Sequence, residues 1–92
     1  MKSGELVGKQ VINGQAQLLG TIYEVEIHTN KLAVTDIYVE LEKTVIEAMG
    51  FQKPRVRGSV KISIPVNEIN ATSDVVSLKK STTELKGIAK RV

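Results

Sequence analysis

The only histidine of the chain, His28, is the first residue to consider for chemistry, because there is no cysteine to act as a nucleophile or a metal ligand. A zinc site would need carboxylates for every ligand besides this imidazole, and zinc seldom accepts such a set. No Gly-x-Ser-x-Gly segment frames a serine for a Ser-His-Asp arrangement. We therefore interpret His28 as a surface residue beside a turn.

Two carboxylates, Glu24 and Glu26, fall on the same face of an expected strand, the arrangement that a retaining glycosidase or a hard-cation site uses. A domain this small has no cleft that would exclude water from an exposed strand, so we assign both to a solvated face. Gly8-Lys9 lacks the further glycines and the Ser/Thr of a phosphate-binding loop. The sequence thus indicates a protein that is not an enzyme, with no catalytic, metal or cofactor-binding residues and no cofactor.

A row of cations recurs at odd positions of a segment that alternates with apolar residues: Lys53, Arg55, Arg57 and Lys61. Side chains two residues apart in a strand share a face and lie about 6.5 to 7 Å apart, so this row can follow an acidic partner or the phosphates of RNA. The simpler interpretation is cross-strand pairing with carboxylates of the chain, at about 0.2 to 1 kcal/mol for each pair. This face has no aromatic residue on which bases could stack, so we prefer the pairing. The acidic candidates are Glu24, Glu26, Asp36 and Glu40.

The composition describes one small domain. A chain of 92 residues is too short to divide into two ordinary domains. Its apolar residues are mainly Val, Ile and Leu, with one Phe, two Tyr and no Trp, a bias that favours sheet over helix. No apolar run approaches the roughly 20 residues of a membrane span, and no signal peptide begins the chain, so we expect a soluble, cytoplasmic protein.

Alternation of apolar and polar residues predicts short β-strands connected by turns. In the second strand, Tyr23, Val25 and Ile27 alternate with charged residues, so we expect these three side chains to face the core. Asn13-Gly14 supplies two residues that tolerate positive φ, as a tight turn after the first strand requires. The expected strands span residues 6–12, 18–28, 32–41, 52–64 and 71–78.

These strands predict a fold class that is mainly all-β. Closing about five to six of them on themselves removes vulnerable edges, so we expect a small antiparallel barrel. The alternation is clearest from 52 to 64, where Gly58 has the inward parity and Pro65 ends the strand. In the strand from 32 to 41, the expected inward residues are Ala33, Thr35, Ile37, Val39 and Leu41.

The segment 42–51 departs from this alternation and predicts one short helical insertion. Thr44 with Glu47 three residues later fits a capping box, and Gly50 is placed to end the helix. An isolated helix of one or two turns is marginal, so its apolar side must pack on the domain itself or on a partner. Both interpretations stay open, and the candidate self-association residues are Val45, Ile46, Met49 and Phe51.

The last fourteen residues carry most of the positive charge. Residues 79–92 hold five cations and one carboxylate, a net charge of +4, so residues 1–78 carry −1 of the total of +3. We divide the chain into a domain at 1–78 and a basic C-terminal tail at 79–92, solvated or disordered as the first interpretation. A Ser81/Glu84 capping box also fits a short helix. Its apolar residues, which can dock on an acidic partner, on an anionic membrane or on the barrel, are Leu85, Ile88 and Val92.

Two motifs near the ends of the domain resemble the PRC-barrel family. The opening motif comprises Leu6, Gly8, Lys9, Val11 and Ile12, and a long strand follows with Gly20, Ile22, Val25 and Ile27. The closing motif comprises Ile64, Pro65 and Ile69, followed by Asp74, Val75 and Leu78. The chain departs from the family's pattern at Glu24, where Asp is frequent, and at Ser73, where Gly-Asp is frequent. The length and the helical insertion resemble short stand-alone archaeal members, the CdpB-type cell-division proteins.

The resemblance implies a β-barrel without catalytic residues that binds proteins. It implies an adaptor that self-associates as a homodimer or higher assembly, with itself or a paralogue, and acts in archaeal cell division with FtsZ and its membrane anchor SepF, recruited to the division site. The alternative that it implies is an RNA- or ribosome-associated maturation factor related to the C-terminal domain of RimM.

Overall fold

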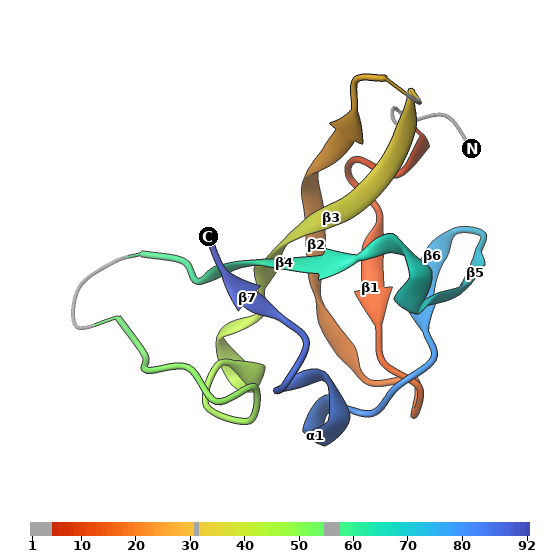
Figure 1. Cartoon of the computed structure of the whole chain (residues 1–92). Helices are drawn as coiled ribbons and strands as arrows, with labels where there is room; N and C mark the ends of the chain where they lie inside the picture. Colours follow the sequence, from red (N-terminus) through yellow and green to blue (C-terminus); the bar gives the residue numbers. More distant parts are fainter. Residues whose placement is uncertain (1–4, 31, 55–57) are drawn as a thin grey trace.

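The computed structural model describes residues 5–30, 32–54 and 58–92, and the protein is mainly β (Figure 1). Seven strands form one mixed sheet in the order β5-β6-β1-β2-β3-β4-β7. The strands are β1 (Gln10–Ile12), β2 (Leu18–His28), β3 (Ala33–Leu41), β4 (Lys61–Pro65), β5 (Ile69–Thr72), β6 (Val75–Leu78) and β7 (Lys90–Arg91). The helical elements are the 3-10 turns η2 (Lys43–Val45) and η3 (Val66–Glu68) and one α-helix, α1 (Thr82–Leu85). No helix among the described residues is long and apolar enough to cross a membrane.

The fold is consistent with the small all-β, barrel-like fold that we expected, but the sheet is mixed and is not closed. β1 lies between β2, with which it is antiparallel, and β6, with which it is parallel. β5 and β7 are the two edges of the strand order, and in the described part of the chain they do not pair with each other. Two strands exceed the expected set, because a turn at Ser73-Asp74 divides the segment 71–78 and because the C-terminal segment adds β7.

The core lies against one face of the sheet, and a β-bulge decides which residues of β2 reach it. Ile37, Val39 and Leu41 of β3 are buried, as the alternation predicts. In β2 the register shifts between Ile22 and Glu24, so that Ile22 is fully buried. Tyr23 was expected inside, but it lies half-buried on the opposite, outer face because the extra residue of a bulge shifts the alternation.

The turn after β1 also differs from the expectation. Neither Asn13 nor Gly14 has a positive φ, and Ala16 takes that conformation instead, with φ of 62°. Gly14 is required by close packing, because a Cβ there would lie 2.6 Å from the carbonyl oxygen of Lys79. The Gly14 amide donates to the Lys80 carbonyl at 2.7 Å, which ties this turn to the C-terminal segment.

The insertion at 42–51 is a 3-10 turn, η2, followed by further turns. The expected capping box is absent, because the turn begins after Glu42 and no side chain caps it. Gly50 does end the segment in a left-handed conformation, with φ of +85°. The Phe51 amide then donates to the Ile46 carbonyl at 3.1 Å, closing the turn back on itself.

The expected strand 52–64 is regular only at β4. The reason is the length of its neighbour: Glu40 pairs with Lys61, and the Leu41 amide reaches the Val60 carbonyl at 2.9 Å, but there β3 ends. Of the residues that precede Val60, the described ones, 52–54 and 58–59, belong to no strand, and Gly58, which was expected to face inward, is exposed. The described residues between η2 and β4 therefore form an irregular loop.

The C-terminal segment is an ordered part of the same body, in contrast to the solvated tail that we expected first. The Ser81/Glu84 capping box is confirmed: the Ser81 hydroxyl accepts from the Glu84 amide at 3.3 Å, and the Glu84 carboxylate accepts from the Ser81 amide at 3.1 Å. Leu85 is fully buried in the core, and the Ser63–Lys90 and Ile62–Arg91 pairs join β7 to β4. Figure 1 shows α1 below the sheet and β7 at the edge of the sheet next to β4.

Candidate functional site

The most distinctive surface is the far part of the β2–β3 hairpin, residues 24–36, which we call the hairpin arm. β1 pairs with β2 only as far as Thr21, and β4 pairs with β3 only from Asp36 onward. Beyond these points the two strands pair with each other, as in the Ile27–Val34 and His28–Ala33 pairs. Figure 1 shows the arm projecting from the body of the molecule. Lys31, in its turn, lies outside the described residues.

One face of the hairpin arm is apolar and only partly covered. Val25 and Val34 are half-buried and pack against the core. Ile27 continues this row toward the tip with 42% of its side chain exposed, and Leu32 in the turn is 85% exposed. Single exposed aliphatic residues are common on protein surfaces, but Ile27 lies beside its register partner Val34 in an apolar row that runs out of the core, and Leu32 follows in the turn. The arm is therefore amphipathic, and its apolar face is available for contact.

The opposite face of the sheet, at the base of the arm, carries an aromatic cluster that we call the tyrosine platform: Tyr23, Tyr38 and Lys61. The two rings stack with centroids 6.1 Å apart and planes 29° apart. The Lys61 ammonium lies 4.9 Å from the Tyr23 ring centroid, a cation–π contact. The Tyr38 hydroxyl donates to the Glu26 carboxylate at 2.7 Å.

The acidic surroundings perturb both phenols of the platform. The hydrogen bond to Glu26 is the main cause that raises the pKa of Tyr38, to about 12, because it stabilises the protonated hydroxyl. Desolvation, followed by the charges of Glu24 and Glu40, raises the pKa of Tyr23 above its usual value. Both phenols therefore remain neutral hydrogen-bond donors across the physiological range of pH.

Sequence reasoning missed this platform. We expected the basic face to lack aromatic residues, and that expectation was wrong for Lys61, since a bulge turns Tyr23 outward and cross-strand packing brings Tyr38 beside it. Only Tyr38 has the outward parity in the sequence, and no local signal shows that the bulge turns Tyr23 to the same face. Among the described residues the expected row of cations is not formed, because Lys53 lies in the irregular loop. Arg55 and Arg57 lie outside the described residues.

For the two described cations, Lys53 and Lys61, other contacts replace the expected cross-strand ion pairs. Lys61 is the register partner of Glu40, but its ammonium lies over Tyr23, and no ion pair joins the two. Lys53 pairs with Glu47 at 3.7 Å, and both side chains are largely exposed. Carboxylates on the outer side of the hairpin thus outnumber the described cations there: they are Glu24, Glu26, Asp36 and Glu40.

A shallow groove of about 670 Å³ adjoins the tyrosine platform. Glu40 lines it at the platform end, beside Thr21. Farther along it is lined by Glu42, Lys43 and Thr44 from the chain around η2. The groove mixes hydroxyl, carboxylate and ammonium groups with the apolar side chains of Leu41 and Ile46, and it is open to solvent, so it fits an extended segment better than an enclosed small ligand.

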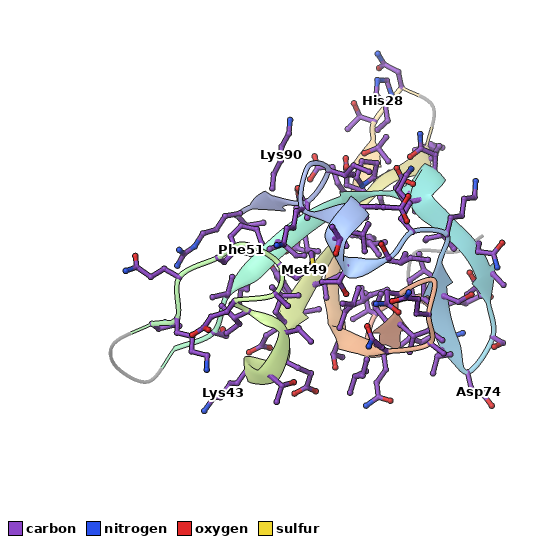
Figure 2. All side chains as sticks on the ribbon, turned by 90° about the horizontal axis from the view of Figure 1, so that it is seen from below. His28, Lys43, Met49, Phe51, Asp74 and Lys90 are labelled. Atoms are coloured by element: carbon purple, nitrogen blue, oxygen red, sulfur yellow. The ribbon has the colours of Figure 1, made fainter. Side chains whose placement is uncertain are left out.

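The four candidate self-association residues of the insertion turn inward. Ile46 and Met49 are each 1% exposed and belong to the core, and Val45 and Phe51 are half-buried against it. Figure 2 shows Met49 and Phe51 within the body of the molecule, whereas His28 stands at its extremity. The structure thus favours packing on the chain's own core, the first of the two interpretations, and confirms that His28 is exposed.

The three apolar residues of the C-terminal segment behave differently from one another. Leu85 is fully buried, Ile88 is half-buried and Val92 is 68% exposed. Of the three destinations that the sequence left open, Leu85 takes the chain's own core. Lys80 also turns inward, since its ammonium contacts both oxygens of the Glu68 carboxylate at 2.6 and 2.9 Å.

Asn13 is a further residue whose importance the sequence did not reveal. It is 1% exposed, and its side-chain oxygen accepts from the amides of Gln15 and Gln17, both at 2.9 Å. Its side-chain nitrogen donates to the Gln17 side chain at 2.9 Å and to the Thr82 hydroxyl at 2.8 Å. The side chain thus builds its own turn and anchors α1, which is a structural role.

Among the described residues no group of three or more His, Asp or Glu side chains is arranged to hold a metal ion. Comparison with known families and with characterised proteins finds no family model and no protein that matches the chain. The PRC-barrel resemblance therefore stays a prediction, and the two faces of the hairpin are the features that bear on function.

Proposed function

We propose that this chain is a non-enzymatic protein-interaction module that associates with a second copy of itself through the apolar face of the hairpin arm. The observation that carries the proposal is the exposure of Ile27 and Leu32 at the end of the arm, where the Ile27–Val34 and His28–Ala33 pairs lie beyond the last described pairs with β1 and β4. Burial of apolar surface contributes about 25 cal/mol for each Å² removed from water. A partly covered apolar row is therefore a favourable place for a contact.

The geometry favours contact between apolar faces over contact between strand edges. In an antiparallel pairing of two copies of the β2 edge centred on Glu26, the two Glu26 carboxylates would lie opposite each other, and like charges so placed destabilise a sheet. Contact between two Ile27 rows instead leaves Glu24 and Glu26 in solvent on the outside. A twofold axis through the Ile27 row uses the same patch on both copies, the commonest symmetry of soluble oligomers.

The resemblance of the sequence to the PRC-barrel family suggests the cellular process in which such a module would act. On that basis we propose an adaptor of the archaeal division machinery that works with FtsZ and SepF and is recruited to the division site. Its support is the pair of end motifs, several of whose residues are buried here, namely Leu6, Val11, Ile64 and Leu78. These residues support a scaffold role for the motifs. Affinity purification of the tagged chain from archaeal cells should recover a division protein.

Self-association is tested by the mass of the protein in solution. Light scattering after size exclusion, at high micromolar concentration, should give a dimer or larger species for the native chain. Ile27→Lys should give a monomer, because two ammonium groups would face each other across the contact. Val92→Lys is the matched control, since it places the same charge at an exposed apolar residue away from the arm. A native chain that is strictly monomeric at that concentration excludes the proposal.

The RNA-associated alternative has one observation in its favour, the stacked pair of Tyr23 and Tyr38, since aromatic rings are the usual platforms for bases. The charge around the rings opposes it. Phosphates would approach the same face as Glu24, Glu26 and Glu40, and only Lys61 of the platform would attract them. Protein interaction is therefore the function that the geometry supports better.

A further inference from the structure

We infer that the tyrosine platform and the groove beside it form a docking surface for a cationic peptide segment, with an arginine or lysine of that segment seated on the Tyr23 ring. This surface lies on the opposite side of the hairpin from the Ile27 row. The inference therefore does not depend on self-association, and the two can fail separately.

The Tyr23 ring already shows the geometry of a cation site. The Lys61 ammonium lies 4.9 Å from the ring centroid, inside the distance of about 6 Å at which a cation is attracted to an aromatic face. Tyr38 stacks beside it and is held by its hydrogen bond to Glu26, so the two rings form one fixed surface. A planar guanidinium stacks on such a surface better than a compact ammonium does.

The charges around the platform favour a positively charged ligand. Cross-strand register places Glu24 beside Tyr38, and Glu40 beside both Thr21 and Lys61. Glu26, bonded to the Tyr38 hydroxyl, completes three carboxylates around the rings. Against them stand the ammonium groups of Lys61 and of Lys90, whose residue pairs with Ser63 on β4. A cationic segment is attracted to this surface, and an anionic one meets a net negative charge.

The groove indicates the direction in which the bound peptide segment would run, from the platform past Glu40 toward Glu42. Glu40 belongs to both the platform and the groove, and Glu42 lies farther along the groove. Alternate side chains of an extended peptide are about 6.5 to 7 Å apart on one side. A segment with cations at alternate positions can therefore place one on Tyr23 and the next toward Glu40 and Glu42.

Lys61 gives the inference its sharpest consequence, because it competes with the ligand. Its ammonium must leave the Tyr23 ring when another cation takes that place. Replacing Lys61 with Gln removes both the competitor and one positive charge, so a cationic segment should bind about two- to fivefold more tightly. An acidic protein or RNA would instead bind more weakly to the same variant, because it loses a cation.

The probe is a capped Gly-Arg-Gly-Arg-Gly peptide titrated into the isotope-labelled full chain and followed by NMR at low salt. Resonances of Tyr23, Tyr38 and Glu40 should shift together, and the peptide with Glu in place of Arg should cause no shift there. Tyr23→Leu should weaken binding about two- to fivefold, as expected for the loss of one exposed cation–π contact. Asp74→Asn is the matched control, since it removes an exposed carboxylate at the β5–β6 turn, far along the chain from the platform residues. The affinity of this variant for the arginine peptide should stay within about a factor of two of that of the native chain.

Three outcomes would overturn the inference. The first is an absence of shifts at the platform up to millimolar arginine peptide. The second is weaker peptide binding by Lys61→Gln, or an oligouridylate that binds the platform and binds this variant less well, since the surface then takes RNA. The third is a set of platform shifts that depends on protein concentration alone, because a second copy would then occupy the surface. The first two outcomes have no bearing on the mass measurement with Ile27→Lys, whereas the third predicts a dimer that this substitution leaves intact.

Discussion

The hairpin arm and the C-terminal segment 79–92 differ from each other in burial, and in each the burial is the opposite of what its sequence suggests. On its β2 side the arm alternates regularly between charged and apolar residues, yet Ile27 and Leu32 remain 42% and 85% exposed. The C-terminal segment has the composition of a cationic tail, yet Leu85 is fully buried and Lys80 contacts the Glu68 carboxylate at 2.6 Å. Alternation predicts that a segment pairs as a strand, and composition predicts that a segment is polar. Neither property tells whether other parts of the chain bury the segment's apolar side chains.

The largest expected effect separates the two regions by stability. Leu85→Ala removes a fully buried side chain from the core and should lower the free energy of unfolding by about 2 to 5 kcal/mol. Ile27→Ala, on the arm, should lower it by less than about 1 kcal/mol. Urea denaturation of both variants at a low protein concentration measures the difference. Equal losses would mean that the arm contributes to the core as much as the C-terminal segment does.

A smaller effect concerns the anchor between the first turn and α1. Asn13→Ala removes the hydrogen bonds to the Thr82 hydroxyl and to the two amides of its own turn, and should cost about 1 to 3 kcal/mol. Amide hydrogen exchange should quicken at residues 82–85 more than in β3, because the loss is local to α1. Gln15→Ala, at an exposed neighbour of which only the backbone contacts Asn13, serves as the control. Unchanged exchange in α1 would contradict the anchoring role.

The smallest expected effect probes the polar face of the hairpin. The pKa of Tyr38 is raised to about 12, above the usual value of 10. Its stabilising contribution is therefore complete below pH about 10 and is lost as the pH rises toward about 12, because the bond to Glu26 needs the protonated hydroxyl. Ultraviolet absorbance should show this late phenol titration in the native chain and its loss in Tyr38→Phe.

Glu26→Gln is the companion variant for this titration. It keeps the ring and the hydroxyl but removes the carboxylate that accepts the bond at 2.7 Å. The pKa of Tyr38 should then fall toward its usual value. A titration that stays as late in this variant as in the native chain would show that desolvation, the second cause, outweighs the hydrogen bond.

The sequence predicted the positions of the two long strands better than the structure of the segments that connect them. The predicted strand from 18 to 28 has the bounds of β2, and the strand from 32 to 41 differs from β3 by one residue at its start. The Ser81/Glu84 capping box was predicted because its residues lie three apart in the chain. The Thr44/Glu47 box has the same spacing and does not form, since the chain turns tightly there and packs Ile46 and Met49 into the core.

The candidate surfaces were less accessible to sequence reasoning. The tyrosine platform depends on a bulge between Ile22 and Glu24, and a single extra residue moves a side chain to the other face of a sheet. The proposed self-association site moved from the insertion to the arm, because packing on the core removed Ile46 and Met49 from the surface. No local pattern distinguishes an apolar residue that its own chain covers from one that it leaves open.

By itself, the sequence determined that this protein is mainly β and where its long hairpin runs, and its Ser81/Glu84 spacing indicated where a last helix could begin, because these depend on alternation, turn residues and capping within a few positions of each other. Only the tertiary structure decided which faces are covered. Asn13 and Thr82 are 69 positions apart, and the hydrogen bond between them exists only once the sheet has formed. The same holds for the Tyr23–Tyr38 stack, because its partners lie on different strands and meet through a register that no local pattern specifies.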